Sequence, residues 1–224
     1  RKGQAMTERL VRIYPLFERF WHWSQALLIV VLFASGLRIM GLYEALPFGL
    51  AFLLHVSAAI ALVVLWVFAI FWHLTTGTWR HYVPTTHGLL KVARFYAWGI
   101  FKGDAHPYRK AYWRKHNPLQ ALTYLALKLV LFPVIWITGL LYLTYNIWGA
   151  EPDRATWLPV VANLHVLVGF AIASFVVVHV YLLTVGGSFR THVKPMLTGF
   201  DKVDLTPEEE AYLAQDEPGR LRAG

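Results

Sequence analysis

Four histidines lie inside apolar runs that are long enough to cross a membrane: His22, His55, His165 and His179. Imidazole nitrogens are common ligands of transition metals, and ionisable residues at membrane depth usually mark a functional site. His165 and His179 are 14 residues apart. On an α-helix they therefore face within about 40° of each other and lie ~21 Å apart along the axis. Two nitrogen ligands on one helix face, at two depths, predict two stacked metal centres.

Depth along each expected helix sorts the histidines into two level pairs. Counted from the outer end at ~1.5 Å per residue, His55 and His165 both lie about 12 Å deep and form an outer pair. His22 lies about 30 Å deep and His179 about 33 Å, which makes them an inner pair. His73 competes for the inner pair because it follows His55 by 18 residues, but at about 39 Å it lies some 6 Å beyond His179. We favour His22 and expect His73 at the membrane interface.

The chemistry that fits two paired imidazoles is axial ligation of a b-type haem, with the porphyrin filling the space between helices. The chain has no cysteine, which excludes disulfides, iron–sulfur ligation and thioether attachment of a c-type haem. A structural zinc site needs about four ligands close together, whereas each pair supplies two. Small residues such as Gly36 and Gly169 suit a flat cofactor, although plain helix packing accounts for either one alone.

Membrane helices must position these ligands, and the composition of the chain is that of a membrane protein. Of the 224 residues, 57% are hydrophobic and 15% charged, with a mean hydropathy of +0.45, which is typical of a membrane protein. The predicted fold is all-α, a transmembrane four-helix bundle over residues 12–190 with two b-haems between its helices, followed by a tail over residues 191–224. Four segments reach the ~20 residues that a crossing requires: Trp21–Leu42, Pro47–Trp72, Leu119–Tyr145 and Leu158–Val185.

Basic residues are concentrated before the first helix, between the second and third, and after the fourth. The positive-inside rule therefore places both termini and the central loop, residues 77–118, in the cytoplasm, and the protein in a prokaryotic inner membrane. Nucleic acid is an unsuitable partner for so apolar a chain despite its net charge of +8. Met6 and a position upstream of Arg1 are both candidate starts. The basic residues include Arg1, Lys2, Arg9 and Arg12, then Arg80, Lys91, Arg94, Lys102, Arg109, Lys110 and Arg114, then Arg190, Lys194 and Lys202.

Two cytoplasmic segments carry their own expectations. Residues 88–101 mix Lys91 and Arg94 with leucines and aromatics, which predicts a helix lying on the membrane surface or an ordinary helix packed on the bundle. The tail from Asp201 is acidic and polar, and we expect a solvated extension there.

The run from Glu18 to Trp23, ERFWHW, resembles the first-helix motif of the di-haem cytochrome b subunits of nickel–iron hydrogenases, formate dehydrogenases and thiosulfate reductases. The spacing of His165 and His179 matches the two fourth-helix ligands of that family, and His55 matches its remaining ligand. The resemblance implies a four-helix bundle with two b-haems, which carry electrons across the membrane between quinone and a partner subunit.

A quinone site is expected at the cytoplasmic mouth of the third helix. There the run from His116 to Gln120, HNPLQ, resembles a similar Asn and Gln run beside the menaquinone site of the formate dehydrogenase subunit. Lys115, His116, Asn117 and Gln120 supply hydrogen-bond donors for a quinone carbonyl, and Trp113 supplies a flat wall. A helix capped by Asn117 explains the same residues structurally, and both interpretations can hold.

Three further residues are candidate partners of haem propionates: Arg19, Arg38 and His73. For Arg19 the alternative is a positive-inside charge, and for Arg38 a snorkelling side chain.

The predicted function is transfer of electrons between the quinone pool, menaquinone or ubiquinone, and an extracytoplasmic partner. That partner is an iron–sulfur or c-type haem protein, or a catalytic subunit of hydrogenase or molybdoenzyme type. The chain has no catalytic motif of its own, so we expect an electron-transfer subunit. A histidine-lined proton or metal transporter is an alternative, but it predicts intramembrane carboxylates, which are almost absent. A stand-alone haem reductase is another, and a plain membrane anchor gives no reason for level histidine pairs.

Overall fold

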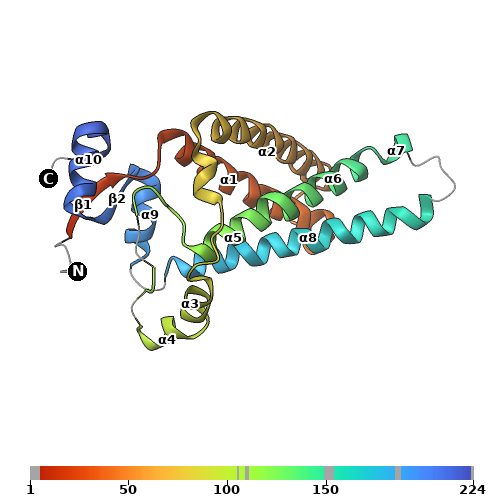
Figure 1. Cartoon of the computed structure of the whole chain (residues 1–224). Helices are drawn as coiled ribbons and strands as arrows, with labels where there is room; N and C mark the ends of the chain where they lie inside the picture. Colours follow the sequence, from red (N-terminus) through yellow and green to blue (C-terminus); the bar gives the residue numbers. More distant parts are fainter. Residues whose placement is uncertain (1–5, 105, 109–110, 149–153, 185–187, 223–224) are drawn as a thin grey trace. The chain divides into compact units, whose positions relative to one another are not determined.

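The computed structural model describes residues 6–104, 106–108, 111–148, 154–184 and 188–222. The chain divides into two compact units, each of which is described by itself. The membrane unit comprises residues 23–76 and 124–180, and the terminal unit comprises residues 1–22, 77–123 and 181–224 (Figure 1). Val185, the expected end of the fourth helix, lies outside the described residues, as do the loop charges Arg1, Lys2, Arg109 and Lys110.

Four helices are long and apolar enough to cross a membrane, as the sequence predicts. The first begins five residues before its predicted start, and the second ends four residues after its predicted end. The third consists of three shorter elements that together form one continuous helix. The helices are α1 (Leu16–Ile39), α2 (Phe48–Thr76), the series α5 (Pro118–Ala126), η3 (Leu127–Leu131) and α6 (Phe132–Leu143), and α8 (Arg154–Leu182).

Local sequence explains where α1 begins and ends. Pro15 has no N–H group, so it is well suited to precede the first turn, and its carbonyl accepts the first helical hydrogen bond, from Arg19 at 3.2 Å. The helix ends in a Schellman motif, in which Gly41 adopts φ +80° and Leu42 donates to the carbonyl of Leu37 at 3.0 Å. Glycine is suited to this position because it reaches positive φ without steric cost.

The third membrane helix contains a π-helical turn, η3, which ends two residues before Pro133. Pro133 has no N–H group and its ring crowds the carbonyl four residues earlier. Phe132 instead donates to the carbonyl of Leu127, five residues back, so the wider turn accommodates the proline without ending the helix. Proline within a membrane helix is tolerated where such local adjustments satisfy the backbone.

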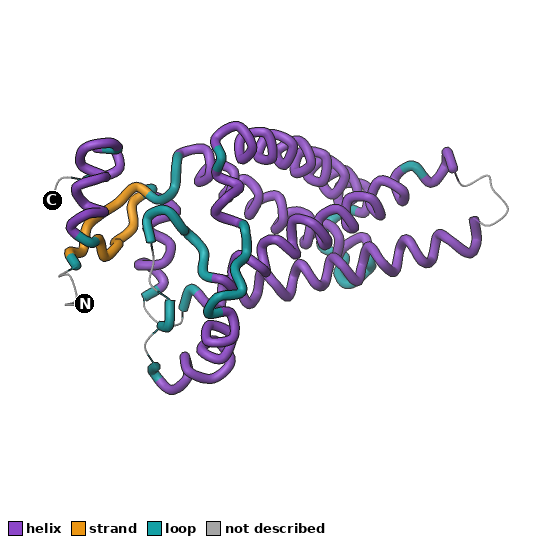
Figure 2. The backbone as a smooth tube through the Cα atoms, viewed as in Figure 1, coloured by secondary structure: helices purple, strands orange, loops and turns teal. Residues whose placement is uncertain are grey.

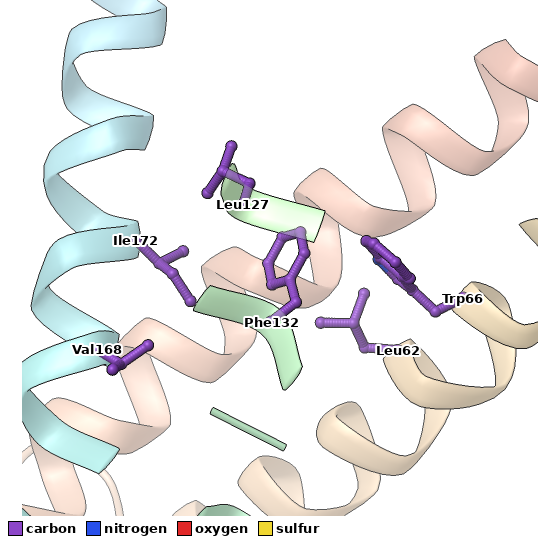
Figure 3. Packing of buried hydrophobic residues seen from close by; sticks show 6 residues of the cluster. All are labelled: Leu62, Trp66, Leu127, Phe132, Val168 and Ile172. Carbon is purple, nitrogen blue, oxygen red and sulfur yellow. The ribbon is translucent and has the colours of Figure 1, made fainter. Parts of the chain in front are cut away.

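The membrane unit packs around one apolar cluster drawn from three of its helices: Leu62, Trp66, Leu127, Phe132, Val168 and Ile172 (Figure 3). The Trp66 ring meets Phe132 edge-on at a centroid distance of 5.0 Å. Its Nε1 donates to Oε1 of Gln25 on α1 at 3.0 Å. This bond ties α1 to α2 and gives an intramembrane glutamine the partner that it needs.

The outer surfaces of these helices remain strongly apolar. Leu27, Val67, Leu129, Leu167 and Val177, drawn from all four, each leave about two thirds of their surface exposed. Apolar patches of this extent are rare on soluble monomers. Such surfaces suit contact with the lipid bilayer, and the protein is therefore an integral membrane protein.

The terminal unit corrects the expectation of an all-α chain with a solvated tail. Strands β1 (Thr7–Arg12) and β2 (Phe200–Leu205) pair antiparallel, with Val11 opposite Asp201 (Figure 2). Val11, Val203 and Leu205 are almost fully buried. The residues that point away from this core on β2 include Lys202 and Asp204, so the acidic composition of the tail concealed a half-buried strand.

A helix completes this small core. In α10 (Pro207–Asp216), Leu213 is fully buried beside Val203 and Leu205. The helix starts at a capping box: the Glu209 N–H donates to the Thr206 hydroxyl at 3.2 Å, and the Thr206 N–H donates to the Glu209 carboxylate at 2.9 Å. The tail is thus an ordered part of a unit that joins the two ends of the chain.

Short elements make up the rest. The expected helix at 88–101 is present as a continuous series from Leu89 to Lys102, and it exposes Leu90, Trp98 and Phe101. The remaining elements are η1 (Thr78–Tyr82), α3 (Leu89–Arg94), η2 (Phe95–Gly99), α4 (Ile100–Lys102), α7 (Tyr145–Trp148), α9 (Phe189–Thr198) and η4 (Pro218–Arg220).

Candidate haem and quinone sites

The structure brings the predicted outer pair together inside the membrane unit. His55 on α2 and His165 on α8 lie with ring centroids 6.3 Å apart and ring planes at 65°. They are 110 residues apart in the chain, so only the packing of two separate helices can produce this contact. Both rings are partly buried.

Each ring rests against a hydroxyl group on a further helix. The Nδ1 atom of His55 lies 3.0 Å from the hydroxyl of Ser35 on α1. The Nδ1 atom of His165 lies 3.0 Å from the hydroxyl of Thr138 on α6. All four helices of the membrane unit therefore contribute to this one site.

A glycine follows each hydroxyl residue and lets the ring approach the helix closely. A Cβ atom added at Gly36 would lie 3.3 Å from Cε1 of His55, and one at Gly139 would lie 3.2 Å from Cε1 of His165. Ordinary carbon–carbon contacts are about 3.5 to 4.0 Å. Any larger residue at either position would therefore press on the imidazole.

The spacing of the outer pair is compatible with two imidazole ligands on one metal. An imidazole–metal bond is about 2.0 Å long and the ring centroid lies roughly 1.1 to 1.2 Å beyond the nitrogen, so two imidazoles that shared one metal would have centroids up to ~6.3 Å apart. That is the separation observed. Within the described part of the chain, no group of three or more His, Cys, Asp or Glu side chains gathers to hold a metal ion. The remaining ligands would have to come from the cofactor, as a porphyrin provides.

The candidates for the inner pair come from three helices. His22 lies on α1 and belongs to the terminal unit, whereas His179 lies on α8 in the membrane unit. His179 stacks on Phe175, one turn earlier, with centroids 5.7 Å apart. His73 on α2 is buried, and its Nδ1 donates to the carbonyl of Ala69. A metal-bound histidine typically makes such a bond with its second nitrogen, so His73 stays a competitor of His22.

The two candidate propionate arginines are held by main-chain carbonyls. Arg19 donates to the carbonyl of Leu197 in the last turn of α9, where a cation complements the helix dipole. Arg38 donates to the carbonyl of Leu46 and lies over the ring of Phe48. Both arginines thus have a structural role, which the sequence did not predict.

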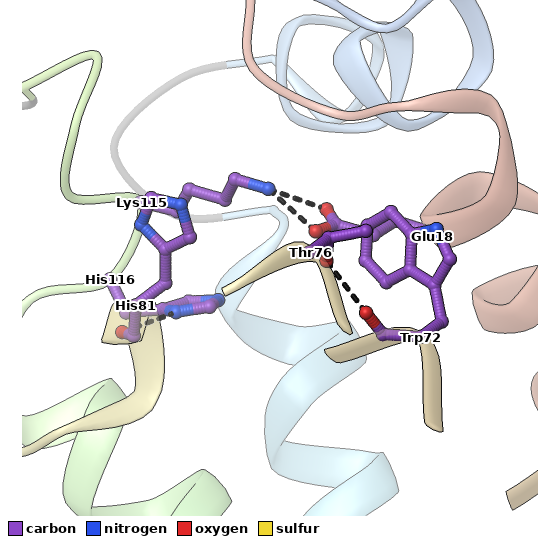
Figure 4. A network of polar contacts seen from close by, with 6 residues as sticks. All are labelled: Glu18, Trp72, Thr76, His81, Lys115 and His116. Atoms are coloured by element: carbon purple, nitrogen blue, oxygen red, sulfur yellow. Dashed lines mark hydrogen bonds and ion pairs between the residues drawn. The ribbon is translucent and has the colours of Figure 1, made fainter. Parts of the chain in front are cut away.

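Lys115, a predicted quinone donor, is occupied by a buried ion pair. Its Nζ atom lies 2.7 Å from both carboxylate oxygens of Glu18, and both side chains are only 6% exposed (Figure 4). The ammonium also lies 5.6 Å from the centre of the Tyr14 ring. Burial lowers the pKa of Lys115, and the Glu18 carboxylate opposes that shift.

The other quinone candidates lie near one another at the start of α5. Asn117 and Gln120 cap the helix reciprocally: the Gln120 N–H donates to Asn117 Oδ1 at 2.9 Å, and the Asn117 N–H donates to Gln120 Oε1 at 3.1 Å. The Asn117 amide also donates to the Tyr96 hydroxyl at 3.2 Å. The capping interpretation is therefore correct, and it uses the acceptor oxygens of both residues while the Gln120 amide nitrogen is still a donor.

His116 and Trp113 complete this predicted group. His116 donates to the carbonyl of His81 at 3.3 Å (Figure 4). The His116 ring also lies 4.9 Å from that of Tyr82, measured between ring centroids. Trp113 is largely exposed. Tyr96, whose pKa is raised by burial, is a member of this polar group that the sequence did not single out.

Four candidate membrane helices and a pair of facing histidines fit a membrane cytochrome b. The chain belongs to the prokaryotic cytochrome b561 family, whose model matches residues 13–199. Membership implies haem b binding and a role in electron transfer.

Among curated proteins, the chain is similar to YdhU of Escherichia coli (strain K12), which is named as a cytochrome. The two are 30% identical over 198 residues, which cover 86% of this chain and 75% of YdhU. No solved structure matches the chain significantly.

Several residues of the outer site escaped the sequence analysis. Ser35, Thr138 and Gly139 were not recognised, although each hydroxyl residue directly precedes a glycine inside an apolar run. That doublet, repeated in the first and third membrane helices, is a signal that could have identified them. Glu18 was noted only as part of the first-helix motif, because nothing in the sequence links it to Lys115.

Proposed function

We propose that this protein is a di-haem cytochrome b that transfers electrons between the quinone pool and an extracytoplasmic redox partner. The observation that carries the proposal is the pairing of His55 and His165 at a separation of 6.3 Å, which suits axial ligation of one haem b. Haem b, when bound, supplies a one-electron Fe(III)/Fe(II) couple.

The second haem is assigned to His22 and His179. The helix α8 carries His165 and His179 on one face, ~21 Å apart along its axis. Two haems held at these depths would divide the membrane crossing into short steps. His73 is the alternative inner ligand, because its Nδ1 bonds to a carbonyl, as the second nitrogen of a metal-bound histidine typically does.

A quinone site is proposed at the start of α5. Gln120 and His116 lie there within one helical turn of the buried Asn117. The Gln120 amide can donate a hydrogen bond to a quinone carbonyl, and His116, whose Nδ1–H is bound to the carbonyl of His81, can do so from Nε2 in its protonated form. Lys115 is expected to act indirectly, because its ammonium already binds Glu18. Trp113 is the weakest member of the group, since it is exposed.

The distribution of basic residues supports the proposed orientation. Arg80, Arg94 and Arg114, like most basic residues outside the helices, flank the ends of the membrane helices that we assign to the cytoplasm. Both termini and the quinone site then lie on the cytoplasmic side of an inner membrane. Electrons would leave or enter on the opposite side, through an iron–sulfur protein, a c-type haem protein or a catalytic subunit.

Histidine substitution tests the assignment. We expect His55→Ala and His165→Ala each to remove one haem from the purified protein and to spare the other. His22→Ala and His179→Ala should each remove the second haem instead. His87→Ala, at an exposed loop position, is the control and should keep both.

The haem content of each variant is measured from the reduced-minus-oxidised visible spectrum with haem counted per chain. If His55→Ala and His165→Ala retained full haem content, the outer site would be wrong. If His73→Ala removed a haem and His22→Ala did not, the inner site would need His73 in place of His22.

A further inference from the structure

We propose that the doublets Ser35-Gly36 and Thr138-Gly139 are two matching sockets that hold His55 and His165 in the tautomer and orientation needed for metal binding. Here a socket means the hydroxyl residue together with the glycine that follows it. This inference rests on the proposed function, because it assigns positioning residues to the proposed outer haem ligands.

The hydroxyl groups set the tautomer of each ring. The Ser35 hydroxyl lies 2.6 Å from the carbonyl of Val31, and the Thr138 hydroxyl lies 2.7 Å from the carbonyl of Val134. A hydroxyl has one proton, and each is directed at a carbonyl that cannot donate. The contact with the imidazole therefore uses a lone pair of the hydroxyl oxygen, so the ring must donate from Nδ1–H.

The consequence concerns the other nitrogen of each ring. A neutral imidazole that carries its proton on Nδ1 has an unprotonated Nε2, which is the form that binds metals. The two hydroxyl groups also have the same surroundings. The Ser35 hydroxyl lies 3.2 Å from the carbonyl of Leu32, and the Thr138 hydroxyl lies 3.1 Å from the carbonyl of Ile135, so the ring N–H meets an equivalent hydroxyl oxygen in both sockets.

The glycines fix how deep each ring sits. The added Cβ atom would lie 3.6 Å from Nδ1 of the histidine in both sockets, and closer still to Cε1. An alanine at Gly36 or Gly139 would push the ring outward by a few tenths of an ångström. Glycine is a poorer helix former than alanine, and the close approach of the imidazole gives a spatial reason for it at both positions.

The two sockets are built independently yet agree closely. They lie on different helices, α1 and α6, and face histidines from α2 and α8. The hydroxyl-to-ring distance is 3.0 Å in both. A serine or threonine inside a membrane helix can donate its hydroxyl proton to a carbonyl of the preceding turn. This habit explains the bonds to the carbonyls, but it does not explain why an imidazole approaches the hydroxyl in both sockets.

Such a bond also tunes the ligand. When Nδ1–H donates to an oxygen, Nε2 becomes a stronger electron donor and favours the ferric over the ferrous state of a bound haem. The sockets would thus both raise haem affinity and lower the potential of the outer haem.

Thr138 offers a matched pair of substitutions. Thr138→Val keeps the shape and removes the hydroxyl, whereas Thr138→Ser keeps the hydroxyl and removes a methyl group. We expect Thr138→Val to weaken retention of the outer haem by about 10- to 100-fold. We expect it also to lower the ferric-to-ferrous ratio at a fixed potential by up to about tenfold, which is an upward shift of up to ~59 mV for one electron.

Thr138→Ser should stay close to the wild type in both measurements, and Ser35→Ala should repeat the effect of Thr138→Val at the other ring. The control is Ser174→Ala, because Ser174 makes the same bond to a carbonyl four residues back, at 2.9 Å, but is exposed. Haem content per chain and a redox titration of the visible bands provide the readouts.

Comparison with the histidine variants separates the two proposals. If His165→Ala kept both haems, the proposed function would fail whatever Thr138 does. If His165→Ala lost one haem while Thr138→Val and Ser35→Ala matched Thr138→Ser in haem content and potential, the sockets alone would be refuted.

Discussion

The buried ion pair between Glu18 and Lys115 leads to the sharpest stability prediction. Both side chains are only 6% exposed and the ammonium contacts both carboxylate oxygens at 2.7 Å. Two perturbations break it from opposite sides: Glu18→Gln leaves a buried ammonium, and Lys115→Met leaves a buried carboxylate. Removal of one partner of a buried pair usually costs about 3 to 5 kcal/mol of unfolding free energy.

Proton exchange limits each penalty. The unpaired Lys115 can lose its proton, at a cost of about 1.36 kcal/mol per pH unit between the solution pH and its ordinary pKa of 10.5. At pH 7 the charge-burial part of the penalty of Glu18→Gln is therefore at most about 4.8 kcal/mol. The unpaired Glu18 can take up a proton instead, which limits the charge-burial part of the penalty of Lys115→Met to about 3.7 kcal/mol at pH 7, given an ordinary carboxyl pKa of about 4.3.

These limits give the two variants opposite pH dependences. In Glu18→Gln, the pKa of Lys115 falls further because the opposing carboxylate is gone, so the unfolded state binds more protons and stability rises with pH up to about 10.5. In Lys115→Met, the folded state retains a proton on Glu18 that the unfolded state loses, so stability rises as the pH falls towards about 4.3. Each slope approaches about 1.36 kcal/mol per pH unit relative to the wild type.

The assay is denaturant unfolding of the purified protein in detergent at pH 6, 7.5 and 9. The double variant Glu18→Gln/Lys115→Met should lose less stability than either single variant, because it buries no charge. Lys202→Met is the control, since Lys202 pairs with Glu8 at 2.6 Å but both are more than half exposed, and exposed pairs contribute little. Parallel pH profiles for the two single variants, or penalties no larger than that of Lys202→Met, would refute a dry, buried pair.

Three further predictions concern the fold. Leu213→Ala should lower the free energy of unfolding by about 2 to 5 kcal/mol and make the tail susceptible to trypsin. Leu197→Ala, at an exposed position, should leave the digestion pattern unchanged. Equal digestion of the two variants would argue against the β2–α10 core. Thr206→Ala should cost about 0.5 to 2 kcal/mol by loss of the cap, measured by hydrogen exchange of the first turn of α10, and unchanged exchange would contradict the capping box. Trp66→Phe should cost about 0.6 to 1.7 kcal/mol by loss of the bond to Gln25, measured by unfolding in detergent, and stability equal to the wild type would show that the bond contributes nothing.

The membrane helices were predictable because their signal is local. An uninterrupted apolar run of ~20 residues has few alternatives to a crossing helix. The first helix nevertheless starts at Leu16, five residues before the predicted start, because Glu18 and Arg19 interrupt the apolar pattern. Their charges are satisfied by Lys115 and by the carbonyl of Leu197, which are distant in sequence.

The outer histidine pair was also within reach of the sequence. A helix has a fixed rise, so the depths of His55 and His165 could be compared by counting residues, and the structure places the two rings side by side. Their supporting groups required knowledge of which helices are neighbours. Counting along one helix cannot show that Ser35 meets His55 or that Thr138 meets His165.

The two-stranded sheet was missed for a related reason. Each strand has six residues, and about 190 residues separate Val11 from its partner Asp201, so no local turn signal links them. Local signals were present all the same, in the alternation of Val203 and Leu205 and in the spacing of Thr206 and Glu209. The acidic composition of the tail, which is typical of a solvated extension, concealed these signals.

We propose that this chain holds two b-type haems, each between two histidines. The most direct test is a reduced-minus-oxidised visible spectrum of the purified protein, with haem measured by pyridine haemochrome and divided by protein concentration. We expect two haems per chain, both low-spin with two histidine ligands, and two separable steps in a redox titration. A colourless protein, or one haem per chain with a single redox step, would contradict it.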